Sequence, residues 1–546
     1  MSRTNTAADL WNSMWKQHYR IKELFQFSSY MKKKESLKEI EDNSIEEEKT
    51  NNNDPNFKPT YTKARLIGLI LGPALFLVTL LFFQPSDLSS QGVATLAITL
   101  WIATWWITEA IPIPATALLP IILFPSFGAL GSGEVVSSYG DDIIFLFLGG
   151  FLIAGAMEKW NLHLRIALFI INLIGVSSNR LVLGFMVSTG FLSLWISNTA
   201  AAMIMIPIGL AIITQAAKSF ENKPESIDDL KKFEKSIVFG IGYAATIAGS
   251  GTLISGTANP IMAAQAKKLF DVDITFGQIM MVGIPFVAIF ITLVWLYLTK
   301  VKYRTKIKYF PGGSEIIKDE KKKLGKMIFE EKIVLIIFTF VAFMWITRSF
   351  IWTNILIEVS DGMIAMLAVI LLFSIPAANR KERILEWDDT KKIPWGILVL
   401  FGGGLAIAAA FTNTGLAEWI GQQLVLLEGA HYLLILSVLI ASVLILTEIT
   451  STTATATLLM PIVGMLGVAI GVNPIILMLA SAFATNASFM LPVATPPNAI
   501  LFGTGKVSIL EMIKVGGALN IISFFLILLI ATIYLPMVWG LDMLNF

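Results

Sequence analysis

Two short polar stretches lie in the middle of long apolar segments and decide the fold: SLWISNT (193–199) and TEITSTT (447–453). The apolar segments around them, 180–216 and 431–468, are each too long for one membrane span of about 20 residues. Inside a bilayer the backbone groups of a broken helix must be buried in protein. We therefore predict two re-entrant helical hairpins with these stretches at their tips.

The composition indicates a membrane protein. Of the 546 residues, 55% are hydrophobic and only 15% are charged, against about 45–50% and about 25% in soluble domains. A soluble chain of this kind would expose far too much apolar surface. We predict an all-α polytopic membrane protein with about 11 transmembrane helices plus the two hairpins. The expected full spans are 66–83, 92–108, 113–126, 142–158, 236–266, 277–299, 330–350, 361–376, 393–411, 475–503 and 509–535.

The residue types argue against several kinds of chemistry. The chain has no cysteine, so it has no thiolate metal site, disulfide or cysteine nucleophile. Its three histidines, His18, His163 and His431, are far apart in sequence. No glycine-rich phosphate loop ending in Lys-Ser or Lys-Thr is present, which argues against an ATP-driven pump. We therefore expect neither an enzyme nor a nucleic-acid-binding protein.

The positive charges predict the orientation. The N-terminal tail (1–64) and the loops at 217–235, 300–332 and 377–392 are basic, and basic loops lie on the cytoplasmic side. This places the N-terminus in the cytoplasm, the C-terminus outside, and the chain in the cell membrane as a multi-pass protein. Residues 10–26 have one apolar and one basic face, as expected of either an interfacial helix or a helix packed on the protein's own surface.

The two halves of the chain resemble each other. FLGGFL (147–152) matches LFGGGL (400–405) at an offset of 253, and SNTA (197–200) matches STTA (451–454) at an offset of 254. With hairpins opening to opposite sides, this predicts an inverted repeat, the architecture of many secondary transporters. The expected parts are the tail at 1–64, a first half at 65–299, a basic cytoplasmic linker at 300–329 and a second half at 330–546.

Two later spans are also interrupted by polar residues, at GSGTLISGTANP (249–260) and NASFMLPVATPPN (486–498). For one such cluster, close helix packing is the simpler explanation. Four clusters paired by the repeat favour a binding site. Broken helices expose amide N–H groups that suit an anionic carboxylate, and carbonyl and hydroxyl oxygens that suit a small cation.

These motifs, together with WWITEAIP (105–112), resemble the divalent anion/sodium symporter family, which includes bacterial sodium-dependent dicarboxylate transporters. The resemblance covers the chain from about residue 60 to the C-terminus. It implies a homodimer in the lipid bilayer, with a scaffold domain and a transport domain that moves as an elevator. It also implies sodium-coupled uptake of C4-dicarboxylates such as succinate, fumarate and malate, with Na⁺ as the coupling ion.

The resemblance also implies the residues of the sites. Substrate contacts are expected from the tips and from the two broken spans: Ser197, Asn198, Thr199, Ser451, Thr452, Thr453, Thr257, Thr495 and Pro497. The first sodium site falls on Ser193, Ser197, Asn198 and Gly256. The second falls on Thr447, Thr450, Thr452 and Ala494.

Two departures from the family pattern leave alternatives open. The second tip has Thr452 where the family usually has asparagine, and the first broken span reads GTANP (256–260) where the family has Gly-Thr-Pro-Pro-Asn. A sodium-independent dicarboxylate exchanger, or a transporter of another divalent anion such as sulfate, is therefore the alternative. Glu448, beside the second tip, is either a proton relay or, as we favour, the partner of a polar group or helix end.

Overall fold

The computed structural model describes residues 62–542, apart from 176, 220–226, 308–312 and 425–430. The helix expected at 10–26 lies outside the described residues. Regular structure in the described part is helical, and its one isolated β-bridge joins Pro376 and Arg383. The prediction of an all-α membrane protein is confirmed.

The first half contains a series of helices that ends with a π-helical turn, η2. The bounds are α3 Lys63–Phe82, α4 Ser90–Thr108, α5 Ile113–Thr116, α6 Leu119–Ser126, α7 Ser132–Ser138, α8 Asp142–Lys159, α9 Leu162–Ile174, α10 Ser178–Ser193, α11 Asn198–Ser219, α12 Ile227–Ala248, α13 Ala258–Phe270, α14 Phe276–Leu296 and η2 Tyr297–Lys302.

The second half begins after a connecting helix, α15, and repeats much of this order. The bounds are α15 Gly313–Leu324, α16 Phe329–Thr347, η3 Arg348–Trp352, α17 Thr353–Ile355, α18 Asp361–Ser374, η4 Trp387–Lys392, α19 Trp395–Asn413, α20 Leu416–Leu424, α21 Tyr432–Ile449, α22 Thr452–Ala469, α23 Pro474–Thr485, α24 Pro496–Gly503, α25 Ile509–Leu529, η6 Ile530–Tyr534 and α26 Leu535–Trp539.

Both predicted hairpins are present. In the first, α10 and α11 are separated by residues 194–197; in the second, α21 and α22 are separated by residues 450–451. The two later broken spans are present as well, as α12 with α13 and as α23 with α24. The order of a span, a short helix, a hairpin and a broken span therefore occurs twice along the chain.

The expected full span at 113–126 is instead two short helices, α5 and α6. Each begins with proline among its first residues, Pro114 in α5 and Pro120 in α6. Proline has no N–H to donate and favours the first turn of a helix. Even end to end, the 14 residues would reach about 21 Å, which is less than the about 30 Å hydrocarbon core.

Nine helices in the described part are long and apolar enough to cross a membrane. Three of these nine are arms of the hairpins. Many residues on the outer helices are apolar and exposed, including Ile70, Phe82 and Ile336. Apolar exposure on this scale fits a surface in contact with lipid.

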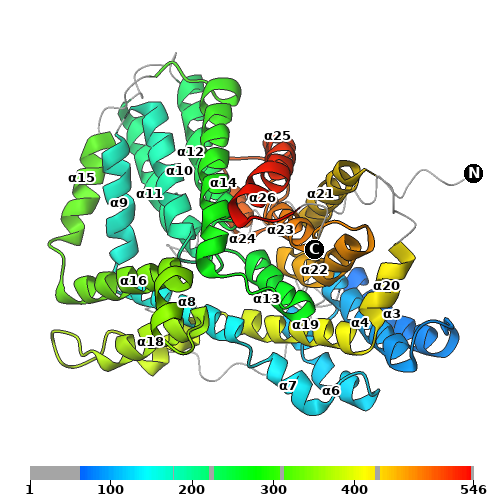
Figure 1. The fold of residues 1–546 in the computed structure, drawn as a ribbon. Coiled ribbons are helices and arrows are strands. Elements are labelled where there is room, and N and C mark those ends of the chain that lie inside the picture. The colour runs from blue at the N-terminus through cyan, green and yellow to red at the C-terminus, as the bar shows by residue number, and fades with distance from the viewer. Residues whose placement is uncertain (1–61, 176, 220–226, 308–312, 425–430, 543–546) are drawn as a thin grey trace, which may run out of the picture.

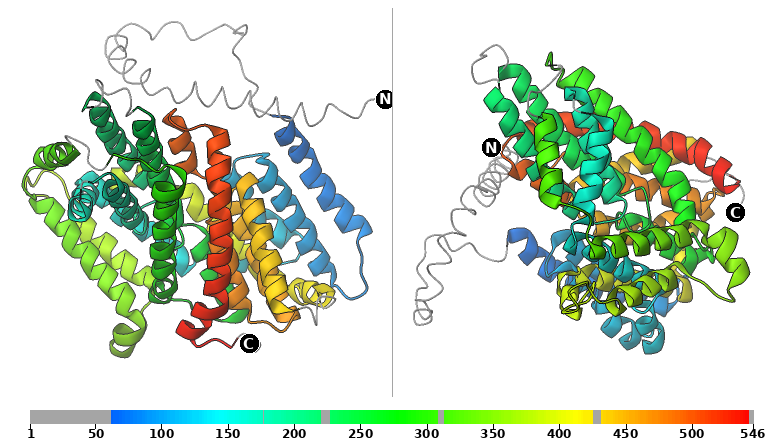
Figure 2. Two further views of the ribbon diagram at one scale, coloured as in Figure 1. Left: turned by 90° about the horizontal axis from the view of Figure 1, so that it is seen from above. Right: turned by 90° about the vertical axis from the view of Figure 1, so that its left-hand side faces the viewer.

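The helices form two groups that lie side by side (Figure 1). Helices α3–α8 and α16–α19 lie along one side of the molecule, and α9–α14 with α21–α26 lie along the other. The right-hand view of Figure 2 shows the same division, and its left-hand view shows that the start of α3 and the end of α26 lie on opposite faces of the molecule. The polar site lies in the second group, where the hairpins and broken spans meet.

Candidate functional site

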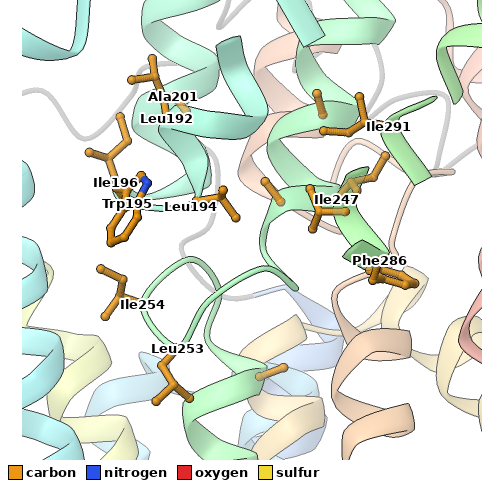
Figure 3. Close-up of a cluster of buried hydrophobic side chains, with 14 of the residues drawn as sticks. Leu192, Leu194, Trp195, Ile196, Ala201, Ile247, Leu253, Ile254, Phe286 and Ile291 are labelled. Carbon is orange, nitrogen blue, oxygen red and sulfur yellow. The ribbon is translucent and has the colours of Figure 1, made fainter. Parts of the chain in front are cut away.

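The first hairpin tip packs on the first broken span through apolar side chains. Leu194, Trp195 and Ile196 are buried and face the loop that carries Leu253 and Ile254 (Figure 3). Apolar packing of this kind excludes water from the polar groups beside it. The tip is therefore held in place by its apolar residues, while its polar residues turn to the neighbouring backbone.

Asn198 begins α11 and lies among three oxygen atoms. With its amide nitrogen turned towards them, it donates to the carbonyls of Ser255 (2.8 Å) and Ala245 (3.3 Å) and to Ser193 Oγ (2.6 Å). Ser193 Oγ also donates to the Ala245 carbonyl at 3.0 Å. An amide has both a donor and an acceptor end, so the same cluster with the amide reversed presents a set of oxygens to a cation.

The first break, residues 249–257, is closed by its own side chains. Thr252 and Ser255 bond to each other's backbone N–H groups at 3.0 and 3.1 Å. Asn259 donates to the carbonyls of Gly249 (3.3 Å) and Thr252 (2.9 Å). Carbonyls freed by the break are thus satisfied, as buried backbone groups must be.

The second break is closed by an equivalent asparagine. Asn498 donates to the carbonyls of Ser488 (3.0 Å) and Leu491 (3.1 Å). In both halves the accepting residues precede the asparagine by ten and seven positions, so Asn259 and Asn498 correspond at an offset of 239. The Gly-Thr and Ala-Thr pairs before them match at an offset of 238. The second half therefore has one more residue than the first between this threonine and the asparagine.

The second tip is tied to the second break by hydroxyl groups. Thr447 Oγ1 donates to the Thr485 carbonyl at 2.8 Å and lies 2.9 Å from Ser488 Oγ. Thr450 instead bonds within its own hairpin, to the Leu446 carbonyl and to Thr455. The structure therefore brings Thr447 to the second break and leaves Thr450 on the hairpin.

Two hydroxyls expected to contact cargo are buried without a hydrogen-bond partner among the described residues: Thr452 Oγ1 and Thr495 Oγ1. A buried hydroxyl without a partner is costly. Pro497 and Ala494 are also buried, and Ser451 precedes α22 with no side-chain cap bond. Oxygen atoms are therefore available at the places where the sequence predicts the second cation and one carboxylate.

Glu448 is buried beside the second tip and accepts hydrogen bonds from four groups. Its carboxylate accepts from the backbone N–H groups of Phe489 (2.8 Å), Met490 (3.0 Å) and Leu491 (3.2 Å). It also accepts from the Asn520 amide at 2.8 Å. The prediction that Glu448 pairs with polar groups is confirmed.

The two halves meet at the centre of the site. Asn486 donates to the Gly249 carbonyl at 3.2 Å, and Thr257 lies 2.9 Å from Thr453, oxygen to oxygen. A Cβ atom at Gly256 would lie 2.5 Å from the Gly249 oxygen. Only glycine permits this close approach of two backbone segments. Both tips and both breaks therefore form one hydrogen-bonded unit.

A cavity of about 350 Å³ reaches the first tip. Ser197 and Thr199 line it, together with Lys159 at the end of α8 and Asp389 in η4. Burial raises the pKa of Asp389, but the backbone N–H of Glu386 and the ammonium of Lys159 outweigh it, so the pKa is below its usual range. Asp389 is therefore ionised, and the cavity carries charges of both signs.

Several residues that build the site were not among its predicted members. They are Ser255, Asn259, Asn486, Ser488 and Asn498. All lie within the two polar stretches that interrupt the later spans. The presence of asparagine near the end of each stretch was the available signal, because a buried amide in a membrane needs partners.

Comparisons with known proteins agree with this architecture. The chain is 53% identical over 490 residues to the sodium-dependent dicarboxylate transporter SdcS of Staphylococcus saprophyticus, covering 88% of this chain and 94% of the relative. SdcS of Staphylococcus aureus strain USA300 is also 53% identical, covering 89% and 94%. The structure of Neisseria gonorrhoeae MtrF, described as an antimetabolite efflux pump, is 12% identical with a TM-score of 0.50, covering 89% and 96%, and bears on the fold alone.

The family assignment rests on the membrane body of the chain. The family model "Sodium:sulfate symporter transmembrane region" matches residues 63–541. This is the part of the chain that contains both hairpins and both broken spans. The resemblance predicted from the sequence motifs is confirmed, and the chain belongs to the sodium:sulfate symporter family.

Proposed function

We propose that the chain is a secondary active transporter that carries C4-dicarboxylates, such as succinate, fumarate and malate, into the cell together with Na⁺. The observation that carries this proposal is the 53% identity to sodium-dependent dicarboxylate transporters over 490 residues. The polar site supports it because its hydroxyl, amide and carbonyl groups suit carboxylates and a hard cation. The chain moves its cargo without changing it, so we do not assign it an enzymatic activity.

We assign the substrate carboxylates to the two hairpin tips, at Ser197, Asn198 and Thr199 and at Ser451, Thr452 and Thr453. Helices α11 and α22 begin at these tips, and the N-terminus of a helix favours an anion. Thr257, Thr495 and Pro497 complete this proposed substrate set from the two broken spans. A dicarboxylate has two like-charged ends, which matches two like tips.

We assign one Na⁺ to each half. In the first half the ligands are Ser193, Ser197, Asn198 and Gly256, and the Asn198 cluster supports this because its oxygens converge. In the second half they are Thr447, Thr450, Thr452 and Ala494, and the hydroxyl of Thr452 without a partner supports this. Sodium beside the tips would offset the charge of the carboxylates, so each cargo would favour binding of the other.

We further propose an elevator mechanism in a homodimer. The hydrogen bonds that join both tips and both breaks support movement as one body. That body contains α9–α14 and α21–α26, and α3–α8 with α16–α19 would form the fixed scaffold. The basic loops support a cytoplasmic N-terminus and an extracellular C-terminus.

Uptake of radiolabelled succinate into proteoliposomes tests the function. We expect uptake with an inward sodium gradient and none when potassium or choline replaces sodium. Uptake that persists without sodium, but requires internal dicarboxylate, would instead identify an exchanger. Competition by sulfate, with no effect of fumarate or malate, would identify a different divalent anion as the substrate.

A further inference from the structure

The cavity at the first tip has an ion pair on its wall, formed by residues that are not among the predicted substrate contacts. Lys159 Nζ lies 3.0 Å from Asp389 Oδ2 and 3.6 Å from Glu382 Oε2. Both Lys159 and Asp389 line the cavity, as do Ser197 and Thr199 of the tip. A single water-accessible space therefore connects the tip to a lysine that already holds carboxylates.

The ion pair can open without leaving Asp389 alone. Asp389 Oδ2 accepts the backbone N–H of Glu386 at 2.9 Å, and Lys392 Nζ approaches Asp389 Oδ1 at 4.0 Å. The Lys392 side chain is 79% exposed and lines the same cavity, so it is free to move closer. Lys159 Nζ also lies 5.5 Å from the centre of the Trp160 ring. The ring stabilises the positive charge of the ammonium but leaves its N–H groups free to choose an acceptor.

The lining of the cavity indicates the side of the membrane from which it is reached. Its wall includes the second half of α8 and residues between 385 and 394, most of which belong to the basic 377–392 loop. The second tip contributes none of the described residues that line it. A ligand at Lys159 would therefore be reached from the side on which the basic loops lie, which the charge distribution makes the cytoplasm.

We propose that Lys159 is a second contact for the dicarboxylate, used as the substrate leaves the first tip towards the cytoplasm. This rests on the proposed transport function and adds a residue to it. The ammonium of Lys159 exchanges the carboxylate of Asp389 for a carboxylate of the substrate, and Asp389 turns to Lys392. The exchange breaks one ammonium–carboxylate pair for each one that it forms, so the substrate is not bound tightly at Lys159 on its way out.

Two substitutions with opposite expected effects test this. Lys159→Gln removes the ammonium. Asp389→Asn removes the competing charge but keeps an oxygen for the Glu386 N–H. We measure sodium-dependent succinate transport in right-side-out vesicles, which report binding from the outside, and in inside-out vesicles, which report binding from the cytoplasmic side. Lys391→Gln is the matched control, because Lys391 is exposed, pairs with Asp388 and does not line the cavity.

We expect Lys159→Gln to raise the half-saturating succinate concentration about tenfold in inside-out vesicles, the factor for losing one charge-assisted contact. Asp389→Asn lowers that concentration, and neither variant changes it in right-side-out vesicles. If the ion pair only held the fold together, both variants would act in the same direction and on both sides, which would overturn the proposal.

A wild-type protein that carries no succinate in either kind of vesicle overturns the proposed function, and this inference with it. A wild-type protein that is active, with half-saturating concentrations unchanged by Lys159→Gln on both sides, overturns only the role of Lys159.

Discussion

Asn198 is positioned to take part in both states, empty and occupied, of the first sodium site that we propose. Its amide lies within 2.6–3.3 Å of Ser193 Oγ and of the carbonyls of Ala245 and Ser255. With the nitrogen facing these oxygens the site is satisfied without a cation, and with the oxygen facing them it offers one more ligand. Alanine can do neither.

We therefore expect Asn198→Ala to abolish succinate uptake while the protein still folds. Ser197 caps this helix by accepting from the N–H of Ala200 at 3.2 Å, so the variant keeps the cap. It loses only the bonds of the amide, at about 1–3 kcal/mol for a buried group left unpaired, too little to unfold a large helical body. Uptake in proteoliposomes and the elution profile in detergent are the measurements. Uptake at the wild-type rate by this variant would contradict the assignment of the first tip.

Substitution of Glu448 is expected to lower stability as well as transport. Glutamine keeps the volume but places a donor against backbone N–H groups that need an acceptor, and each unsatisfied buried group costs about 1–3 kcal/mol. We expect Glu448→Gln to lower the temperature of thermal inactivation by several degrees and to weaken sodium-dependent uptake. Glu418→Gln is the control, since Glu418 is exposed in α20; equal stability of both variants would contradict the role given to Glu448.

Residues of the tips could be predicted because their motifs are local in sequence. The partners of Glu448 could not, because they lie 41–43 and 72 positions further along the chain. The same holds for Asn486 and Gly249, which are 237 positions apart. Sequence patterns show which residues need a partner, but only the packing of the helices shows which partner each one has.

At the scale of elements, the breaks in the later spans depend on one asparagine each. Asn259 and Asn498 each donate to two carbonyls that the break has freed. The sequence predicted the hairpins and the broken spans because polar residues interrupt long apolar segments. It failed at 113–126, where hydropathy alone suggested a span and closely spaced prolines produce α5 and α6 instead.

We expect Asn259→Asp and Asn498→Asp to destabilise the protein strongly, by about 3 kcal/mol or more, since a buried carboxylate would face carbonyl oxygens. Thermal inactivation followed by loss of monodisperse protein measures this. Asn413→Asp at the exposed end of α19 is the control. If the three variants lose stability equally, the asparagines do not close the breaks.

At the scale of the whole molecule, the elevator proposal requires α22 to move along α19. A Cβ atom at Gly404 of α19 would lie 3.7 Å from the Cβ of Thr457 in α22, within the range for a disulfide. The chain has no cysteine of its own, so Gly404→Cys with Thr457→Cys creates the one possible pair. Oxidation should stop sodium-driven uptake, and a reducing agent should restore it.

Each single cysteine variant serves as the control for that experiment. Both should be insensitive to oxidation, because neither has a partner for a bond within the chain. Full uptake by the oxidised, bonded double variant would mean that α19 and α22 do not move past each other, and the elevator proposal would then be wrong.

Glu448 helps to close the second break, and the first break has no such residue. This difference also bears on the direction of transport. At the position that corresponds to Glu448, offset by 254, the first half has Leu194, which is buried against apolar neighbours. Two identical halves would make release on one side the mirror image of release on the other, with equal rates. Here a buried glutamate stands beside the second of the two cation sites that we propose, and a leucine takes its place beside the first. Influx and efflux should therefore differ in rate and in half-saturation, while the combined gradients of sodium and substrate decide the net direction.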